Sequence, residues 1–106
     1  MMSKIPIDLE RIRKEGMDKE ILRAGIIAEL DAINLYEQLA DMTQNKNIRK
    51  LLLDVAREEK THVGEFQTLL LMEDKQQEAE LMFFIVTIML TPSRIKQFQP
   101  SRVATP

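Results

Sequence analysis

The chain contains no cysteine and no tryptophan, and it has only three glycines and four prolines among 106 residues. Without cysteine it can form no disulfide, no thiolate metal site and no cysteine nucleophile. Aromatic residues make up 5% of the chain and its net charge is −2. Both values disfavour the stacking platforms and basic surfaces that are typical of nucleic-acid binding. We therefore expect no nucleic-acid partner and no thiol chemistry.

The sequence also lacks a hydrophobic run long enough for a membrane span. The longest apolar run, residues 81–90, has about ten residues, whereas a helix that crosses a bilayer needs about twenty. Residues 1–15 contain no apolar stretch of signal-peptide length. We expect a cytoplasmic protein without a membrane partner, in which residues 81–90 are buried within the fold or within an oligomer.

What the chain does contain is typical of an all-α protein. It is 44% hydrophobic and 30% charged, and proline is absent from two long amphipathic segments. These predict a helix over residues 19–41, with Asp18 as its N-cap, and a second helix over residues 48–72. The polar break TQNKN at residues 43–47 is short, so the two helices should form an antiparallel hairpin.

The rest of the chain is divided around this hairpin. Residues 1–17 are expected to form an N-terminal arm or short helix, and residues 18–74 the helical hairpin. Asp74 would cap a third helix over residues 75–90. The proline-containing tail, residues 91–106, has no helical periodicity and is expected to be extended or flexible.

Two apolar stripes carry polar residues at their centres. The stripe on the first helix covers an arc of about 80° and has a carboxylate in its middle. Its members are Leu22, Ile26, Glu29, Ile33 and Tyr36. The stripe on the second helix covers a similar arc, with a carboxylate and an imidazole at i, i+3 spacing. Its members are Ile48, Leu52, Val55, Glu59, His62 and Phe66.

Glu29 and Glu59 each lie about 14 residues from the turn, so an antiparallel hairpin places them at the same height. An unpaired buried carboxylate is unfavourable by several kcal/mol. Considered one at a time, these residues have an ordinary explanation without a metal. Glu59 and His62 would form a pair on the surface of their helix, and Glu29 would be a polar residue in a loosely packed helix contact. Taken together, three ligand-type residues at one level predict a metal site. Charges off the stripes, such as Glu37 and Lys60, are expected to be solvated.

Carboxylate oxygens with an imidazole nitrogen suit Fe, Mn or Zn. One Glu on one helix and Glu-x-x-His on the next are half of the ligand set of a ferritin-like di-iron bundle. Because this chain supplies only two long helices, a second copy related by a two-fold axis would complete the set. Four carboxylates would then balance two divalent ions. We therefore predict a hairpin that dimerises into a ferritin-like four-helix bundle and loosens without metal.

At these residues the sequence resembles a known family, the encapsulated ferritins. These proteins are the ferritin-like cargo of encapsulin nanocompartments and also occur fused to the shell protein. The stretches that carry the resemblance are GIIAELDAINLYEQL at residues 25–39 and LLLDVAREEKTHVGEFQTLLL at residues 51–71. The similarity covers about residues 18–74.

The resemblance assigns roles to individual residues. Glu29, Glu59 and His62 match the family's ferroxidase ligands, with Glu59 as the bridging carboxylate and the other two as terminal ligands. Tyr36 matches a tyrosine close to that site. Asp31 matches one acidic position of a metal-entry or secondary site, whose neighbouring acidic position holds an alanine in this chain.

Membership in this family implies that the chain is a ferroxidase, which oxidises Fe(II) with dioxygen at a di-iron site shared between two chains. It also implies a homodimer within a higher ring such as a decamer, and an encapsulin shell protein that stores the Fe(III). The chain departs from the family pattern after about residue 80, and three interpretations of its tail stay open: a docking peptide, a fusion boundary or a shifted reading frame.

Two other classes of function stay open at this point. A rubrerythrin-like di-metal peroxidase would use the same ligand types, although the lack of cysteine removes a rubredoxin centre. A helical cargo or adaptor protein without catalysis would use the polar stripe only to set the register of its helices.

Overall fold

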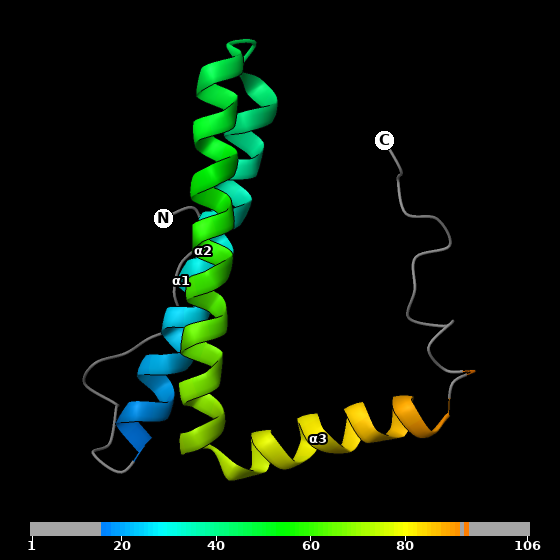
Figure 1. Ribbon diagram of the computed structural model, residues 1–106. Helices are drawn as coiled ribbons and strands as arrows, with labels where there is room; N and C mark the ends of the chain where they lie inside the picture. Colours follow the sequence, from blue (N-terminus) through cyan, green and yellow to red (C-terminus); the bar gives the residue numbers. More distant parts are fainter. Residues whose placement is uncertain (1–15, 92, 94–106) are drawn as a thin grey trace. The chain divides into compact units, whose positions relative to one another are not determined.

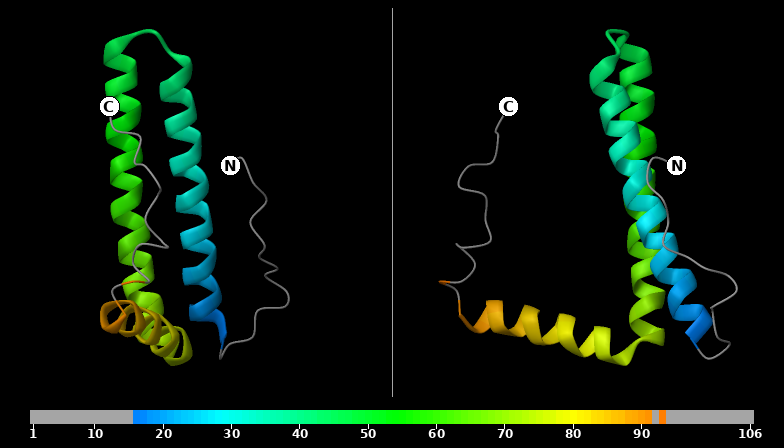
Figure 2. Two further views of the ribbon diagram at one scale, coloured as in Figure 1. Left: turned by 90° about the vertical axis from the view of Figure 1, so that its right-hand side faces the viewer. Right: turned by 180° about the vertical axis from the view of Figure 1, so that it is seen from behind.

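The computed structural model describes residues 16–91 and residue 93, and within them every regular element is an α-helix. The helices are α1 (Met17–Met42), α2 (Lys46–Glu73) and α3 (Lys75–Leu90). Helices α1 and α2 lie side by side in opposite directions, joined by a short turn (Figures 1 and 2). The predicted all-α class and the antiparallel hairpin are therefore confirmed.

Two predicted segments fall almost wholly beyond this part of the chain. Of the N-terminal arm, only residues 16 and 17 are described, and of the tail only residues 91 and 93. The expected short N-terminal helix and the docking peptide thus lie outside the described residues. Helix α3 belongs to a second compact unit, which starts at Asp74 and is separate from the hairpin unit.

Helix α1 begins earlier than the sequence pattern indicates. Its first residue is Met17, and Gly16 occupies the N-cap position without a side-chain cap. The prediction that Asp18 caps the helix is therefore wrong. Asp18 and Glu20 lie in the first turn instead, where a negative charge is stabilised by the positive end of the helix dipole.

The turn between α1 and α2 is held by side chains that satisfy free helix ends. The Asn45 side chain accepts hydrogen bonds from the backbone amides of Asn47 and Ile48, at 2.9 and 3.1 Å. Arg49 donates to the carbonyls of Ala40 and Thr43, at 3.2 and 2.6 Å. Because Asn45 caps α2, this helix begins at Lys46, two residues before the predicted start at residue 48. The turn covers residues 43–45 and is shorter than the predicted break at residues 43–47.

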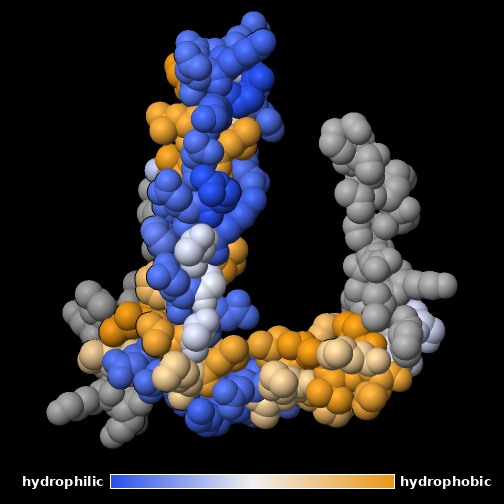
Figure 3. Space-filling view, in the orientation of Figure 1, coloured by the Kyte–Doolittle hydropathy of each residue, from blue (hydrophilic) through white to orange (hydrophobic). Residues whose placement is uncertain are grey.

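The hairpin has a narrow core. The buried hydrophobic side chains among the described residues are Ile33 and Ala40 on α1 and Ala56 and Leu70 on α2. Two of these are alanines, whose small side chains allow the helices to approach closely. Two helices cannot enclose a larger core by themselves, and hydrophobic groups remain visible on the hairpin surface (Figure 3).

Helix α3 begins at a good cap, since the Asp74 side chain accepts a 3.0 Å hydrogen bond from the backbone amide of Gln77. Hydrophobic side chains gather on the visible face of its C-terminal half (Figure 3), and Phe83, Met89 and Leu90 are 71%, 71% and 79% exposed. Side chains of the apolar run at residues 81–90 are thus exposed on α3 taken by itself, and their burial within the fold or within an oligomer stays a prediction. No helix in the described ranges combines the length and hydrophobicity needed to cross a membrane.

Candidate metal site

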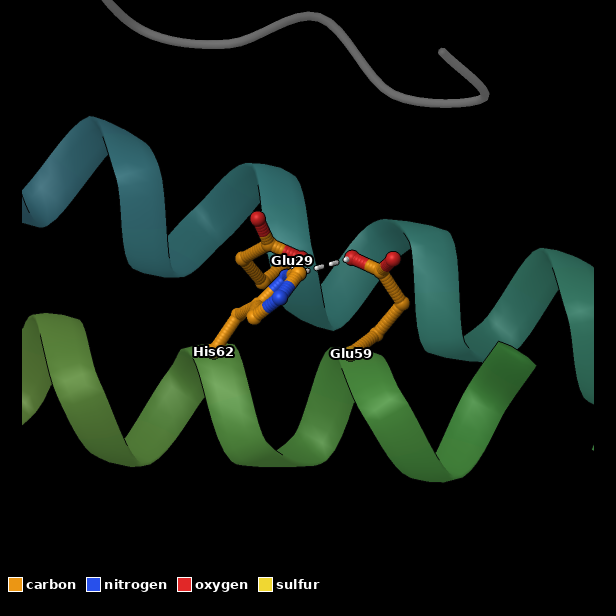
Figure 4. Close-up of polar contacts among 3 residues, drawn as sticks. All are labelled: Glu29, Glu59 and His62. Carbon is orange, nitrogen blue, oxygen red and sulfur yellow. Dashed lines mark ion pairs between the residues drawn. The ribbon is translucent and has the colours of Figure 1, made fainter. Parts of the chain in front are cut away.

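Three side chains from the two long helices converge halfway along the hairpin. Glu29 comes from the middle of α1. Glu59 and His62 come from successive turns of α2, on the side that faces α1 (Figure 4). The i, i+3 spacing puts Glu59 and His62 on one side of α2, and the antiparallel pairing brings Glu29 to the same level. The structure therefore brings together the three residues that the stripes single out.

Distances within the group suit a shared ion. The His62 Nδ1 atom lies 3.6 Å from Oε2 of Glu29 and 3.6 Å from Oε2 of Glu59. One ligand atom from each residue lies within 4.8 Å of the other two. A separation of 3.6 Å is longer than a direct hydrogen bond. Ligand bonds of about 2.1 Å place two ligands of one metal ion about 3 to 4 Å apart.

Burial makes the two carboxylates unusual. The Glu29 and Glu59 side chains are 19% and 20% exposed, whereas His62 is 47% exposed. Oε2 of Glu29 is buried without a hydrogen-bond partner. Leaving a carboxylate oxygen in this state is unfavourable, and a bound cation would compensate it. The donor set and the orphaned oxygen thus fit a metal ion held by Glu29, Glu59 and His62.

The structure does not bring Asp31 and Tyr36 into this group. Asp31 follows Glu29 by two residues, which turns it by about 200° around α1, toward the other side of the helix. Tyr36 lies on the same stripe as Glu29 but about two helical turns farther along. Both side chains are half-buried, and Asp31 is not among the residues whose ligand atoms converge.

Two contacts near the site were not anticipated from the sequence. Lys60 Nζ on α2 and Oε2 of Glu37 on α1 form a 2.9 Å ion pair between the helices, and both side chains are about half exposed, as expected for solvated charges. Gly25 on α1 packs directly against the ring of Phe66 on α2. The only sequence signal for the second contact is a glycine inside a helix, one turn before Glu29.

Comparisons with known proteins agree on the kind of fold. The family model described as Rubrerythrin matches residues 20–96. The crystal structure of an encapsulated ferritin domain from Pyrococcus furiosus superposes with a TM-score of 0.69 at 48% sequence identity. That match covers 86% of this chain and 95% of the solved chain.

Two curated relatives each match somewhat more than half of this chain. A ferritin-like–encapsulin shell fusion protein from Pyrococcus furiosus is 68% identical over 62 residues, which are 58% of this chain and 18% of the relative. The encapsulin nanocompartment cargo protein EncC from Myxococcus xanthus is 41% identical over 58 residues, which are 55% of this chain and 45% of the relative. The chain thus spans less than half the length of each curated relative.

Proposed function

Because the chain belongs to the rubrerythrin family and, within it, to the encapsulated ferritins, we propose that it is a ferroxidase that oxidises Fe(II) to Fe(III). The observation that carries the proposal is the convergence of Glu29, Glu59 and His62 around an orphaned carboxylate oxygen. Iron is the substrate, and these three residues are its ligands. Two carboxylates with one imidazole and no thiolate suit Fe(II).

The three residues have different roles in binding iron. His62 presents Nδ1 toward both carboxylates, so the imidazole and one oxygen of each Glu can face one ion. We assign Glu59 as the carboxylate that bridges two ions, and Glu29 and His62 as ligands to one ion each. The fixed negative charge of the carboxylates stabilises Fe(III) more than Fe(II), and this favours loss of an electron.

Two Fe(II) ions bound together can each give one electron to dioxygen, which takes up two protons and becomes hydrogen peroxide as both ions become Fe(III). Within residues 16–91 one chain gathers three ligand residues, so a second copy would complete a two-ion site. We therefore propose a homodimer in which two hairpins form a four-helix bundle around the iron.

The surface around His62 supports this dimer. Leu51 and Leu69 are 61% and 51% exposed. They lie about three turns before and two turns after His62, on the same side of α2. Large exposed hydrophobic side chains on the side of a helix that carries a candidate site are a common mark of a protein–protein interface. A second hairpin seated there would bury both leucines and bring its own three ligands to the partly exposed imidazole.

The relatives suggest where the reaction takes place. One is named as a fusion to an encapsulin shell and the other as cargo of an encapsulin nanocompartment. We propose that this chain works inside such a compartment in the cytoplasm, as dimers assembled into a ring such as a decamer. A ring of hairpins encloses no storage cavity, so the Fe(III) would pass to the shell. Asp31 and Tyr36 remain proposed contributors to iron entry and to the surroundings of the site.

Rapid mixing of Fe(II) with aerobic protein tests the ferroxidase. The unaltered chain should develop ferric absorbance, and Glu59→Ala and His62→Ala should each abolish it because the ion loses a ligand. Glu20→Ala is the matched control, since it removes an exposed carboxylate in the first turn of α1, far from the site. Unchanged kinetics in either ligand variant would contradict the proposal.

The match to the Rubrerythrin model favours a di-metal peroxidase as the second candidate. The same ligands would serve, but the 106 residues hold no cysteine for a rubredoxin-type electron donor. Turnover measured with hydrogen peroxide and with dioxygen, at equal Fe(II), separates the two. Faster oxidation with peroxide would favour the peroxidase, and metal analysis that finds no bound metal at any iron concentration would favour a non-catalytic adaptor.

A further inference from the structure

A glycine of α1 and an aromatic ring of α2 come very close together one turn from the ligand group. A Cβ atom built on Gly25 would lie 2.7, 2.9 and 3.0 Å from Cε1, Cδ1 and Cζ of the Phe66 ring. Carbon atoms in favourable contact are about 3.5 to 4.0 Å apart. The ring therefore occupies the space that a side chain at position 25 would need.

This contact is in register with the ligands. Gly25 precedes Glu29 by one turn on α1, and Phe66 follows His62 by one turn on α2. Since the helices are antiparallel, both steps lead toward the same end of the hairpin. The layer formed by Gly25 and Phe66 is thus adjacent to the layer in which Glu29 and His62 face each other at 3.6 Å.

We propose that Gly25 is a positioning residue for the metal site. Its missing side chain lets the Phe66 ring pack on the backbone of α1, and this sets the separation of the helices at Glu29, Glu59 and His62. Metal ligands must be held within about 0.5 Å of their working geometry. A methyl group at position 25 would push α1 and the ring apart by a similar amount. The inference rests on the proposed function, because it requires that these three residues bind a metal.

Binding of Co(II) tests this role. The visible absorption of Co(II) reports its coordination, and Co(II) is not oxidised in the assay. Gly25→Ala should weaken Co(II) binding about 10- to 100-fold and change the absorption bands of any Co(II) that still binds. Gly64→Ala is the matched control. It makes the same substitution within α2, where the described residues place nothing within 4 Å of the new methyl group apart from the adjacent backbone of the helix itself. It should bind Co(II) as the unaltered chain does.

A second substitution shows whether the effect passes through the ring. Phe66→Leu in the Gly25→Ala background removes the ring atoms that the methyl group meets, and it should restore Co(II) affinity to within a few-fold of the unaltered chain. Circular dichroism of all variants gives their helix content. If Gly25→Ala alone does not fold, a double variant that folds and binds Co(II) supports the inference.

The outcomes separate this inference from the proposed function. Equal Co(II) binding by the unaltered chain and Gly25→Ala would overturn the positioning role alone. A loss of affinity that Phe66→Leu does not relieve would overturn it as well, since the effect would not come from the ring. Absence of Co(II) binding by the unaltered chain would overturn both the metal site and the role of Gly25.

Discussion

At the scale of single residues, Glu29 is the side chain of the site that most requires a cation beside it. Its Oε2 atom is buried without a hydrogen-bond partner, and His62 Nδ1 lies 3.6 Å away, beyond direct hydrogen-bond reach. A carboxylate in this position opposes folding until a cation lies beside it. Metal binding and folding stability are therefore coupled through this side chain.

Glu29→Gln should change stability in opposite directions with and without metal. In metal-free protein the substitution removes a poorly compensated charge, so the free energy of unfolding should rise on the order of 1 kcal/mol. With Co(II) present the variant should be less stable than the unaltered chain, because a ligand is lost. Thermal melts with chelator and with Co(II) measure both. A variant that is destabilised equally in the two conditions would contradict the coupling.

At the scale of the helices, the C-terminal end of α1 and the N-terminal end of α2 are held by hydrogen bonds from side chains in and beside the turn. Asn45 satisfies two free amides at the start of α2, and Arg49 satisfies two carbonyls at the end of α1 and in the turn. The Glu37–Lys60 ion pair adds a link between the helices, but both side chains are about half exposed. Exposed pairs contribute about 0 to 1 kcal/mol, so the turn is the more important local element.

Asn45→Ala should lower the free energy of unfolding by about 1 kcal/mol, because the first amides of α2 lose their acceptor. Gln44→Ala, at the neighbouring exposed position of the same turn, should change it much less. Denaturant unfolding followed by circular dichroism measures the difference. Asn45→Asp should retain most of the stability, since a carboxylate accepts the same hydrogen bonds. Equal stability of Asn45→Ala and Gln44→Ala would show that the cap is not important.

At the scale of the whole molecule, the hairpin buries too little to be a complete domain. Its buried hydrophobic side chains in the described ranges number four, two of them alanine, while large hydrophobic side chains on both helices stay exposed. A helix needs another element against its apolar side. The proposed dimer supplies that element and the missing metal ligands together, so assembly and iron oxidation should be lost together.

Leu51→Glu and Leu53→Glu compare two sides of α2 with the same chemical change. Both leucines are exposed, at 61% and 46%, and two residues along a helix place them on nearly opposite sides. Leu51→Glu should weaken the dimer at least about tenfold by placing a charge in the interface, and should slow iron oxidation in proportion. Leu53→Glu should retain both. Analytical ultracentrifugation gives the assembly state, and assembled, active Leu51→Glu would contradict the interface.

Chelator treatment examines the same assembly without a substitution. Removal of metal should shift the protein toward smaller species at low protein concentration, since carboxylates gathered from two chains then repel one another. Addition of Co(II) should reverse the shift. Sedimentation that is identical with and without metal would contradict a metal site shared between chains.

The helices, the hairpin and the level of the ligands could be predicted from the sequence because they depend on local periodicity and on the length of the turn. The same stripes that place Ile33 in the core also place Glu29, Glu59 and His62 at one height. The start of α1 was predicted wrongly because a carboxylate such as Asp18 is favourable both as a cap and in the first turn.

The order of amino acids thus specifies which residues share a side of each helix and which chemistry they bring. The distance between the helices becomes known from the fold, since it depends on packing between residues remote in the chain. The contact of Gly25 with Phe66, the ion pair of Glu37 with Lys60 and the orphaned oxygen of Glu29 all follow from that separation. Periodicity along one helix carries no information about the distance to the next.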